Sequence, residues 1–163
     1  MRLQEHIIIS SVAAAALVPA WGIQNSILFI VSAVMIDSDH YLDYLYRTKA
    51  KDWSPARMFR YYDKMTAIQR NSPEVLGFSL FHNAEIFLLV YLLAIFSHLN
   101  FFMVILAGMF FHLILDMFWM KHHKVFFIRS YSLIEHKIRK RLLLKKGLNP
   151  QNFFDKLFKL SVD

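Results

Sequence analysis

The chain has 163 residues, enough for one domain or for a bundle of a few long helices. Hydrophobic residues make up 56% of it and charged residues 19%, below the roughly 25% of soluble domains, which excludes an intrinsically disordered chain. Cys is absent, so disulfide scaffolds and Cys-ligated zinc or iron–sulfur sites are excluded as well. The eight His are unusual in so apolar a chain, because histidine is a common metal ligand and is costly in contact with lipid.

Two long stretches, residues 7–36 and 86–115, contain no Asp, Glu, Lys or Arg. As a single helix, either stretch would exceed the hydrocarbon core of a bilayer, which is about 30 Å thick. Turn-forming residues interrupt each stretch near its middle. The sequence therefore predicts an all-α membrane protein, in which four apolar helices form two helical hairpins, accompanied by amphipathic cytoplasmic helices. The predicted apolar helices are residues 5–18, 25–38, 77–97 and 100–120.

The N-terminal hairpin has two alternatives. Its helices are short for a full crossing, so a tilted or re-entrant pair remains open. A signal peptide is the second alternative, since Arg2 precedes an apolar run with small residues at 13–16. Against it, Glu5 is unusual before such a run, and the apolar stretch resumes after Pro19 without a convincing cleavage site.

The net charge of +7 is concentrated outside the apolar stretches. Apart from Arg2, every Lys and Arg lies between residues 47 and 70 or from residue 121 onward. Because Lys and Arg accumulate on the cytoplasmic side, this predicts a protein of the inner membrane with both termini in the cytoplasm. A nucleic-acid partner is not expected, since the charges flank apolar helices as topology determinants do.

The polar segments also have helical patterns. Ser54-Pro55 is typical of a helix start and predicts a helix to about Gln69. Residues 130–146 read as a basic amphipathic helix, and Asn149-Pro150 opens a last one with Phe153, Phe154, Leu157 and Phe158 on one side. These helices either lie along the membrane surface or pack as a cytoplasmic cap. The predicted organisation is a membrane domain over 1–120, with a basic loop at 44–76, and C-terminal helices over 121–163.

Ligand-type side chains recur at one level of the predicted bundle. At about 1.5 Å per residue, each apolar helix brings one to about 20–22 Å from its hairpin turn, near the cytoplasmic side. Intramembrane ionisable residues are costly and usually functional, which favours a shared metal site over separate interfacial residues or a buried ion pair. The candidate metal ligands are His6, Asp37, Asp39, His40, His82, His112 and Asp116, with Asp39 and Glu85 as candidate catalytic bases.

Local spacing supports the same interpretation. His112 and Asp116 are four residues apart and share a helix face, and the three-residue spacing of His82 and Glu85 predicts a second shared face. Imidazole with carboxylate suits zinc, iron or manganese, and the number of candidates suits one or two divalent ions, with zinc expected. The other histidines are not expected to contribute, because they lie in the opposite turn or in the basic tail: His98, His122, His123 and His136.

These residues together resemble a known family. His6, the run Asp37-Ser38-Asp39-His40-Tyr41-Leu42-Asp43, the triplet Phe81-His82-Asn83 and the pair His112/Asp116 resemble the membrane-bound metal-dependent hydrolases (YdjM-like inner-membrane proteins, distantly similar to zinc-dependent phospholipase C). The resemblance covers about residues 1–120 and implies that these His and Asp residues are the metal and catalytic set. The family often has a further His before the one matching His82; none is present at 71–74, and Glu85 is the candidate to replace it.

Two classes of function follow. In the first, a metal-activated water hydrolyses a phosphoester of a membrane lipid or another amphiphilic substrate, with Asp39 or Glu85 accepting the proton. In the second, the protein is not catalytic and the polar ring is structural or belongs to a metal carrier. A carrier is disfavoured because the outer halves of the helices offer no polar stepping stones. A diiron oxygenase is a less favoured enzyme class, because the histidine-rich clusters of membrane desaturases are absent from the sequence.

Overall fold

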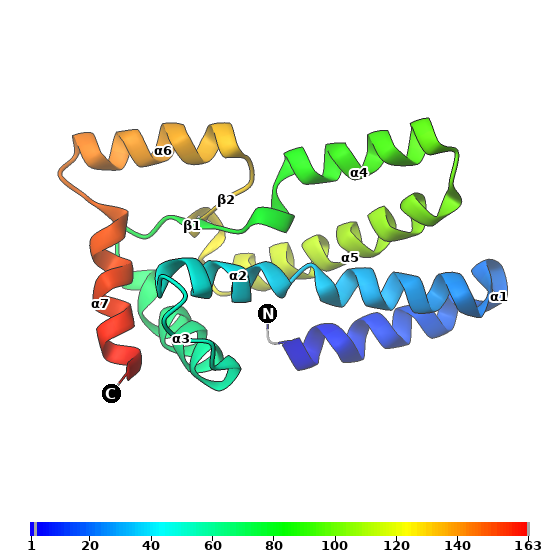
Figure 1. Cartoon of the computed structure of the whole chain (residues 1–163), viewed down its shortest axis with the longest axis horizontal. Helices are drawn as coiled ribbons and strands as arrows, with labels where there is room; N and C mark the ends of the chain where they lie inside the picture. The colour runs from blue at the N-terminus through cyan, green and yellow to red at the C-terminus, as the bar shows by residue number, and fades with distance from the viewer. Residues whose placement is uncertain (2, 163) are drawn as a thin grey trace. The chain divides into compact units, whose positions relative to one another are not determined.

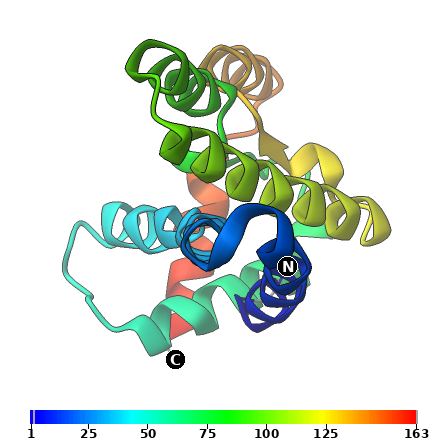
Figure 2. The same cartoon turned by 90° about the vertical axis from the view of Figure 1, so that its right-hand side faces the viewer.

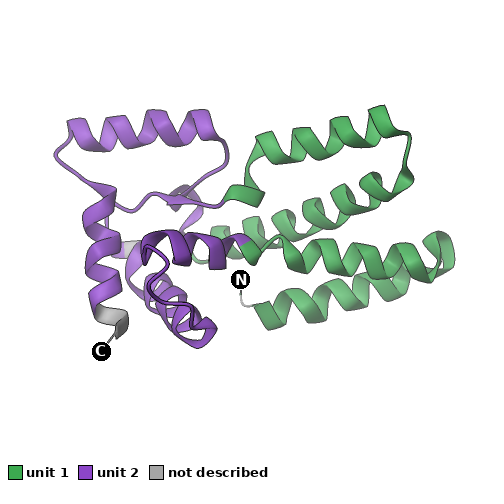
Figure 3. Ribbon diagram, viewed as in Figure 1, with its two compact units in different colours: residues 1–38, 80–123 green, residues 39–79, 124–163 purple. Residues whose placement is uncertain are grey.

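The computed structural model describes residues 1 and 3–162, with the backbone alone for residues 70 and 160–162. It is mostly helical, as predicted. The chain divides into two compact units that alternate along the sequence (Figure 3). Unit 1 comprises residues 1–38 and 80–123, and unit 2 comprises residues 39–79 and 124–163.

Unit 1 contains the two predicted helical hairpins (Figure 1). In the first, the chain reverses at Gly22, where the backbone is not helical (φ 74°, ψ 164°), although Pro19 is still helical. In the second, the turn at His98 and Leu99 joins α4 to α5. In both views of the fold α5 lies between α4 and α1 (Figures 1 and 2). The elements of unit 1 are α1 (Leu3–Met35), the 3-10 turn η2 (Leu80–His82), α4 (Ala84–Ser97) and α5 (Asn100–His122).

Gly22 is expected to be essential to the first hairpin. Its combination of positive φ with ψ near 164° is accessible almost only to glycine. A Cβ atom at this position would have no neighbour within 4 Å, so backbone strain alone would oppose a side chain here. We expect Gly22→Ala to lower the free energy of unfolding by about 1–3 kcal/mol. Thermal unfolding followed by circular dichroism measures this. Gln24→Ala, at an exposed helical position two residues after Gly22, is the control, and an equal loss in both variants would contradict the prediction.

The number of membrane-spanning helices differs from the prediction of four. Two helical stretches are long and apolar enough to cross a membrane, Leu3–Arg47 and Asn100–His122, by length and composition alone. Helix α4 has 14 residues rather than the predicted 21 or so. It starts at Ala84 because residues 77–82 form a short strand and a 3-10 turn, and Asn83 takes the extended backbone of an N-cap. His82 therefore precedes α4, and the shared helix face predicted for His82 and Glu85 is wrong.

The core of unit 1 is small and lies along α5. One cluster joins Ile36 to Phe87, Leu106 and Met109, so that it connects the end of α1 with both α4 and α5. A second cluster, near the first hairpin turn, consists of Ala14, Phe29 and Val104. Beside these clusters, the small buried residues Ser32 and Ala33 of α1 and Gly108 of α5 let the two helices approach closely.

Unit 2 confirms the helices predicted at 54–69, at 130–146 and from 149 onward. Ser54 caps α3 as expected, its hydroxyl accepting a hydrogen bond from the backbone N–H of Arg57 at 3.4 Å. A parallel pair of two-residue strands, too short to leave an alternating pattern in the sequence, was not predicted. The elements are α2 (Ser38–Arg47), α3 (Pro55–Ile68), η1 (Gln69–Asn71), β1 (Gly77–Phe78), η3 (Phe126–Ile128), β2 (Arg129–Ser130), α6 (Leu133–Lys145) and α7 (Pro150–Val162).

Helix α7 is a core helix of unit 2. Phe153, Phe154 and Leu157 are buried against Tyr44 and Tyr61 of α2 and α3. Helix α7 thus packs within unit 2, as the packed-cap alternative predicts. Helix α6 differs, because none of its residues is buried.

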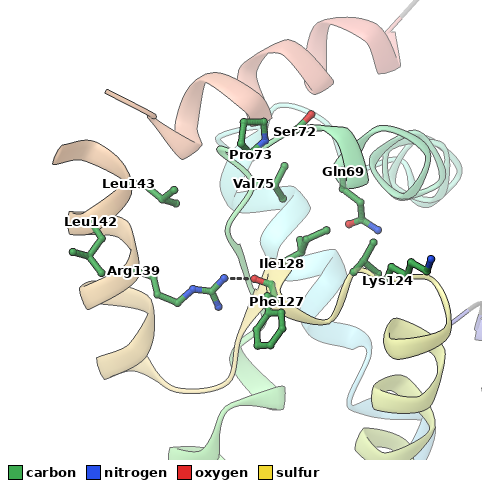
Figure 4. Close-up of a pocket in the computed structure, with 11 residues that line it drawn as sticks. Gln69, Ser72, Pro73, Val75, Lys124, Phe127, Ile128, Arg139, Leu142 and Leu143 are labelled. Atoms are coloured by element: carbon green, nitrogen blue, oxygen red, sulfur yellow. Dashed lines mark hydrogen bonds between the residues drawn. The ribbon is translucent and has the colours of Figure 1, made fainter. Parts of the chain in front are cut away.

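A cavity of about 360 Å³ lies beneath α6 (Figure 4). Arg139, Leu142 and Leu143 of α6 line one side of it. Residues 69–75 and 124–128 contribute the remaining lining. The inner face of α6 thus borders a cavity over part of its length instead of a filled apolar core.

Candidate metal centre

Four side chains of metal-binding type converge in unit 1. Asp37 lies in the short turn between α1 and α2, and His82 is the last residue of η2. His112 and Asp116 lie one helical turn apart on α5. Each residue offers one ligand atom, and these atoms all lie within 4.8 Å of one another. The four residues are therefore close enough to hold a metal ion.

Most of the separations between these atoms are close to those of ligands around one small ion. The Nε2 atoms of His82 and His112 are 3.1 Å apart. Asp37 Oδ1 lies 3.3 Å from Nε2 of His112 and 3.6 Å from Nε2 of His82. Asp116 Oδ2 lies 3.7 Å from both ring nitrogens. Metal–ligand bonds of about 2.0–2.2 Å give ligand–ligand distances of about 3.3–3.6 Å in a tetrahedron, and these five distances lie close to that range.

A backbone carbonyl sets the orientation of His112. Its Nδ1 lies 2.7 Å from the carbonyl oxygen of Ala33 on α1, inside the protein. A carbonyl can only accept a hydrogen bond, so Nδ1 carries the proton and Nε2 presents its lone pair to the cluster. Metal-binding histidines commonly have this arrangement, in which the outer nitrogen donates to a carbonyl or carboxylate.

His6 contacts the opposite side of the two carboxylates. Its Nε2 lies 3.2 Å from Asp116 Oδ1 and 3.9 Å from Asp37 Oδ2. His82 and His112 instead face Asp116 Oδ2 and Asp37 Oδ1. The His6 ring is fully buried and stacks on His112 with ring centroids 3.8 Å apart. The N-terminal ammonium of Met1 also lies 3.1 Å from Asp116 Oδ1. The two carboxylates thus lie between two groups of nitrogen atoms, an arrangement in which a carboxylate can bridge two cations.

Gly108 allows α5 to come close enough to α1 for these contacts. It lies one turn before His112 on the same face of α5. A Cβ atom at this position would lie 2.6 Å from the carbonyl oxygen of Phe29 and 3.1 Å from the backbone N of Ala33. The absence of a side chain at Gly108 therefore brings the Ala33 carbonyl within reach of the His112 ring.

The charges of the cluster favour a bound cation. The side chain of Asp116 is 3% exposed and that of Asp37 is 14% exposed, while His82 and His112 are inaccessible. Buried carboxylates need a compensating positive charge, because they lose the solvation that water provides. Since Asp37 is the most exposed of the four, the centre opens to solvent on the side of that residue.

The other predicted site residues are placed as follows. Asp39 and His40 belong to α2 of unit 2, where His40 Nδ1 lies 3.2 Å from Asp39 Oδ1. Asp39 is buried and His40 is partly exposed. Glu85 lies in unit 1, in the first turn of α4 and three residues beyond His82. These three are not among the four residues of the cluster, and their roles stay predictions.

The residues that orient the site were not predicted. The Ala33 carbonyl is a backbone group with no sequence signature of its own. Gly108 could have been found from the sequence, because it is the single glycine of a long apolar helix and precedes His112 by four residues. The histidines set aside from the sequence lie elsewhere, with His98 in the turn between α4 and α5 and His122 and His123 at the end of α5.

Comparison of the chain with protein-family models, curated proteins and solved structures found no match. The resemblance to membrane-bound metal-dependent hydrolases therefore stays a prediction carried by the motifs themselves. What the chain does has to be inferred from the chemistry that the His and Asp cluster supports.

Proposed function

We propose that this chain is a membrane-embedded metal-dependent hydrolase that acts on a phosphoester of a lipid or another amphiphilic molecule. The observation that carries the proposal is the convergence of two imidazole nitrogens and two carboxylate oxygens within 4.8 Å of one another in unit 1. This donor set, which lacks thiolate, suits zinc among the divalent ions. One ion uses the four residues Asp37, His82, His112 and Asp116, and a second would share their carboxylates with His6.

A bound divalent ion supplies a water with a pKa near 7 and polarises a phosphoryl oxygen. The protein's own residues provide the rest. His82 and His112 are held in place by burial, and the Ala33 carbonyl keeps the His112 lone pair directed at the centre. Asp39 and Glu85 are the proposed acceptors of the proton from the attacking water.

The exposed surface of unit 1 supports a membrane location. Large apolar side chains face outward along its helices, among them Ile8 (63% exposed), Val12 (68%) and Phe118 (69%). A soluble protein seldom exposes apolar helix faces of this extent. An inner-membrane location with cytoplasmic termini is proposed from the distribution of Lys and Arg, and the substrate class from the apolar helices of unit 1 together with the basic segments that flank them in the sequence.

Metal content and hydrolysis test the proposal together. Full-length protein purified in detergent is analysed for bound metal and assayed for release of a phosphorylated headgroup from phospholipid. We expect about one or two zinc ions per chain, and a loss of activity of at least about 100-fold in His112→Ala and Asp116→Ala, because both remove a metal ligand. His122→Ala, a histidine of the same helix outside the cluster, is the control.

The alternative is a structural polar ring, favoured by the contacts of Asp116 with both His6 and the Met1 ammonium, which balance charge without a metal. In that case His112→Ala lowers thermal stability while the wild-type protein contains no stoichiometric metal. Protein that holds metal but hydrolyses no phosphoester would contradict the enzymatic part of the proposal alone.

A further inference from the structure

Helix α6 exposes two isoleucines, while Arg139, Leu142 and Leu143 line the cavity on its inner side. Ile134 and Ile138 are 69% and 53% exposed. Glu135 ties the start of the helix to the preceding turn: its Oε2 accepts a hydrogen bond from the backbone N–H of Tyr131 at 2.7 Å, and its Oε1 accepts one from Arg139 at 2.9 Å. Burial opposes ionisation of Glu135, but these hydrogen bonds outweigh it and hold the pKa of the carboxyl below its usual value.

The inward face is fixed by polar contacts with the backbone. Arg139 donates hydrogen bonds to the carbonyl oxygens of Arg129 and Phe127, at the strand β2 and the turn before it. Ser132 caps the start of the helix through the N–H of Glu135 at 3.1 Å. These polar contacts fix the orientation of α6, and the inner side of the helix borders a cavity and not an apolar core. The exposed Ile134 and Ile138 do not belong to the apolar core of unit 2.

Ile134 and Ile138 form a short apolar stripe among basic side chains. They are four residues apart, so they are neighbours on one side of the helix. The exposed basic side chains of the same helix surround this stripe. These basic residues are Lys137, Lys140, Arg141 and Lys145.

We propose that α6 is a surface-binding helix for anionic lipid, with Ile134 and Ile138 inserted below the headgroups and the flanking Lys and Arg on lipid phosphates. Long basic side chains can lie along apolar surface while their charges reach the headgroups. An apolar stripe bordered by Lys and Arg is typical of helices in the plane of a bilayer interface. Each basic residue near an anionic surface adds attraction that salt weakens.

The chemistry of the stripe favours lipid over nucleic acid. Nucleic-acid backbones are bound by basic and polar side chains, and an exposed pair of isoleucines adds nothing to phosphate contacts. An acidic protein helix would satisfy the same charges, and it is an outcome of the test below. The proposed lipid contact involves unit 2 alone and does not depend on the metal centre of unit 1.

A single fluorescent probe tests the proposal. The chain has no cysteine, so Ile138→Cys can be labelled at one position with an environment-sensitive dye in full-length protein. The labelled protein is reconstituted into nanodiscs of phosphatidylcholine with or without phosphatidylglycerol. A water-soluble quencher then measures exposure of the probe. Asn152→Cys, at an exposed polar position of α7, is the control.

We expect quenching at position 138 to fall at least about threefold when phosphatidylglycerol is present, because the probe moves below the headgroups. High salt, or Lys137→Gln with Arg141→Gln, should reverse this fall, while quenching at position 152 and the metal content stay unchanged. Equal quenching at 138 and 152 in both lipids would overturn the proposal, as would protection at 138 that appears only when another protein is added. Failure of the chain to enter phosphatidylcholine nanodiscs would instead contradict the membrane location of unit 1.

Discussion

Replacing Gly108 with valine is expected to abolish metal binding and to destabilise unit 1 by several kcal/mol. A Cβ atom at Gly108 would meet the side-chain oxygen of Ser32 and lie 2.6 Å from the carbonyl oxygen of Phe29. A side chain can rotate away, but the backbone of α1 cannot, so the two helices must separate. Overpacking of this kind usually costs about 1–3 kcal/mol, and more where backbone has to move. Separation would also remove the Ala33 carbonyl from His112 and release the ring from its orientation.

Gly108→Ala should already produce this clash. The alanine variant separates the clash from an effect of helix propensity, because the two effects change stability in opposite directions. Alanine favours helix more than glycine by about 1 kcal/mol, so Gly108→Ala would stabilise a helix with free space at this position. We expect the opposite, a lower melting temperature together with weaker metal binding. Combining it with Ser32→Ala removes the hydroxyl but leaves the contact with Phe29, and should not restore the wild type. Phe118→Val, at an exposed position of α5, is the matched control.

An unchanged melting temperature and full metal content in Gly108→Ala would contradict the expected clash. Circular dichroism and elemental analysis of the same samples give both readouts. A variant that keeps its melting temperature but loses metal would show that the close approach serves the His112 orientation and not the stability of unit 1.

The ligand set could be predicted because ionisable side chains are costly within apolar helices and usually have a function there. The positions of His6, Asp37, His82 and His112 relative to the hairpin turns predicted that they lie at one level, and the structure brings Asp37, His82, His112 and Asp116 together. The predicted helical position of His82 is wrong, since the apolar run before Ala84 continues through residues that form a strand and a 3-10 turn. Hydrophobic periodicity does not distinguish a helix from such a segment when both are apolar.

The orientation of the amphipathic helices could not be predicted either. Helices α6 and α7 are both basic and both carry Leu or Phe, yet α7 buries its apolar face and α6 exposes its own. The difference arises from Arg139 and Glu135, which bond to the turn preceding α6 and so direct the opposite face outward. Such contacts depend on where β2 lies in three dimensions, which the helical pattern of the sequence does not contain.

Asp116→Asn is expected to weaken zinc binding by at least about 100-fold. Mutation of a residue that only supports a metal ligand typically lowers metal affinity by about 10–100-fold, and loss of a ligand itself should lower it further. Asp116 is the carboxylate that lies within 3.7 Å of His6, His82 and His112. The amide keeps its shape but removes the charge that balances a cation. Zinc at a hundred times the wild-type dissociation constant should stabilise the wild type by about 2.7 kcal/mol and the variant by no more than about 0.4 kcal/mol. Calorimetric titration and thermal unfolding with and without zinc measure the two effects. Asp63→Asn, an exposed carboxylate of α3, is the control.

His6→Ala distinguishes one bound ion from two. If a single ion uses Asp37, His82, His112 and Asp116, removal of His6 leaves the stoichiometry unchanged and weakens affinity only through the lost contact with Asp116. If two ions share the carboxylates, elemental analysis should show the content of His6→Ala falling to half that of the wild type, whereas Asp116→Asn loses both. Two oxygens of each Asp face different histidines, so we expect the halved content. If His6→Ala kept the metal content of the wild type, His6 would be a residue that positions Asp116 and not a ligand of a second ion.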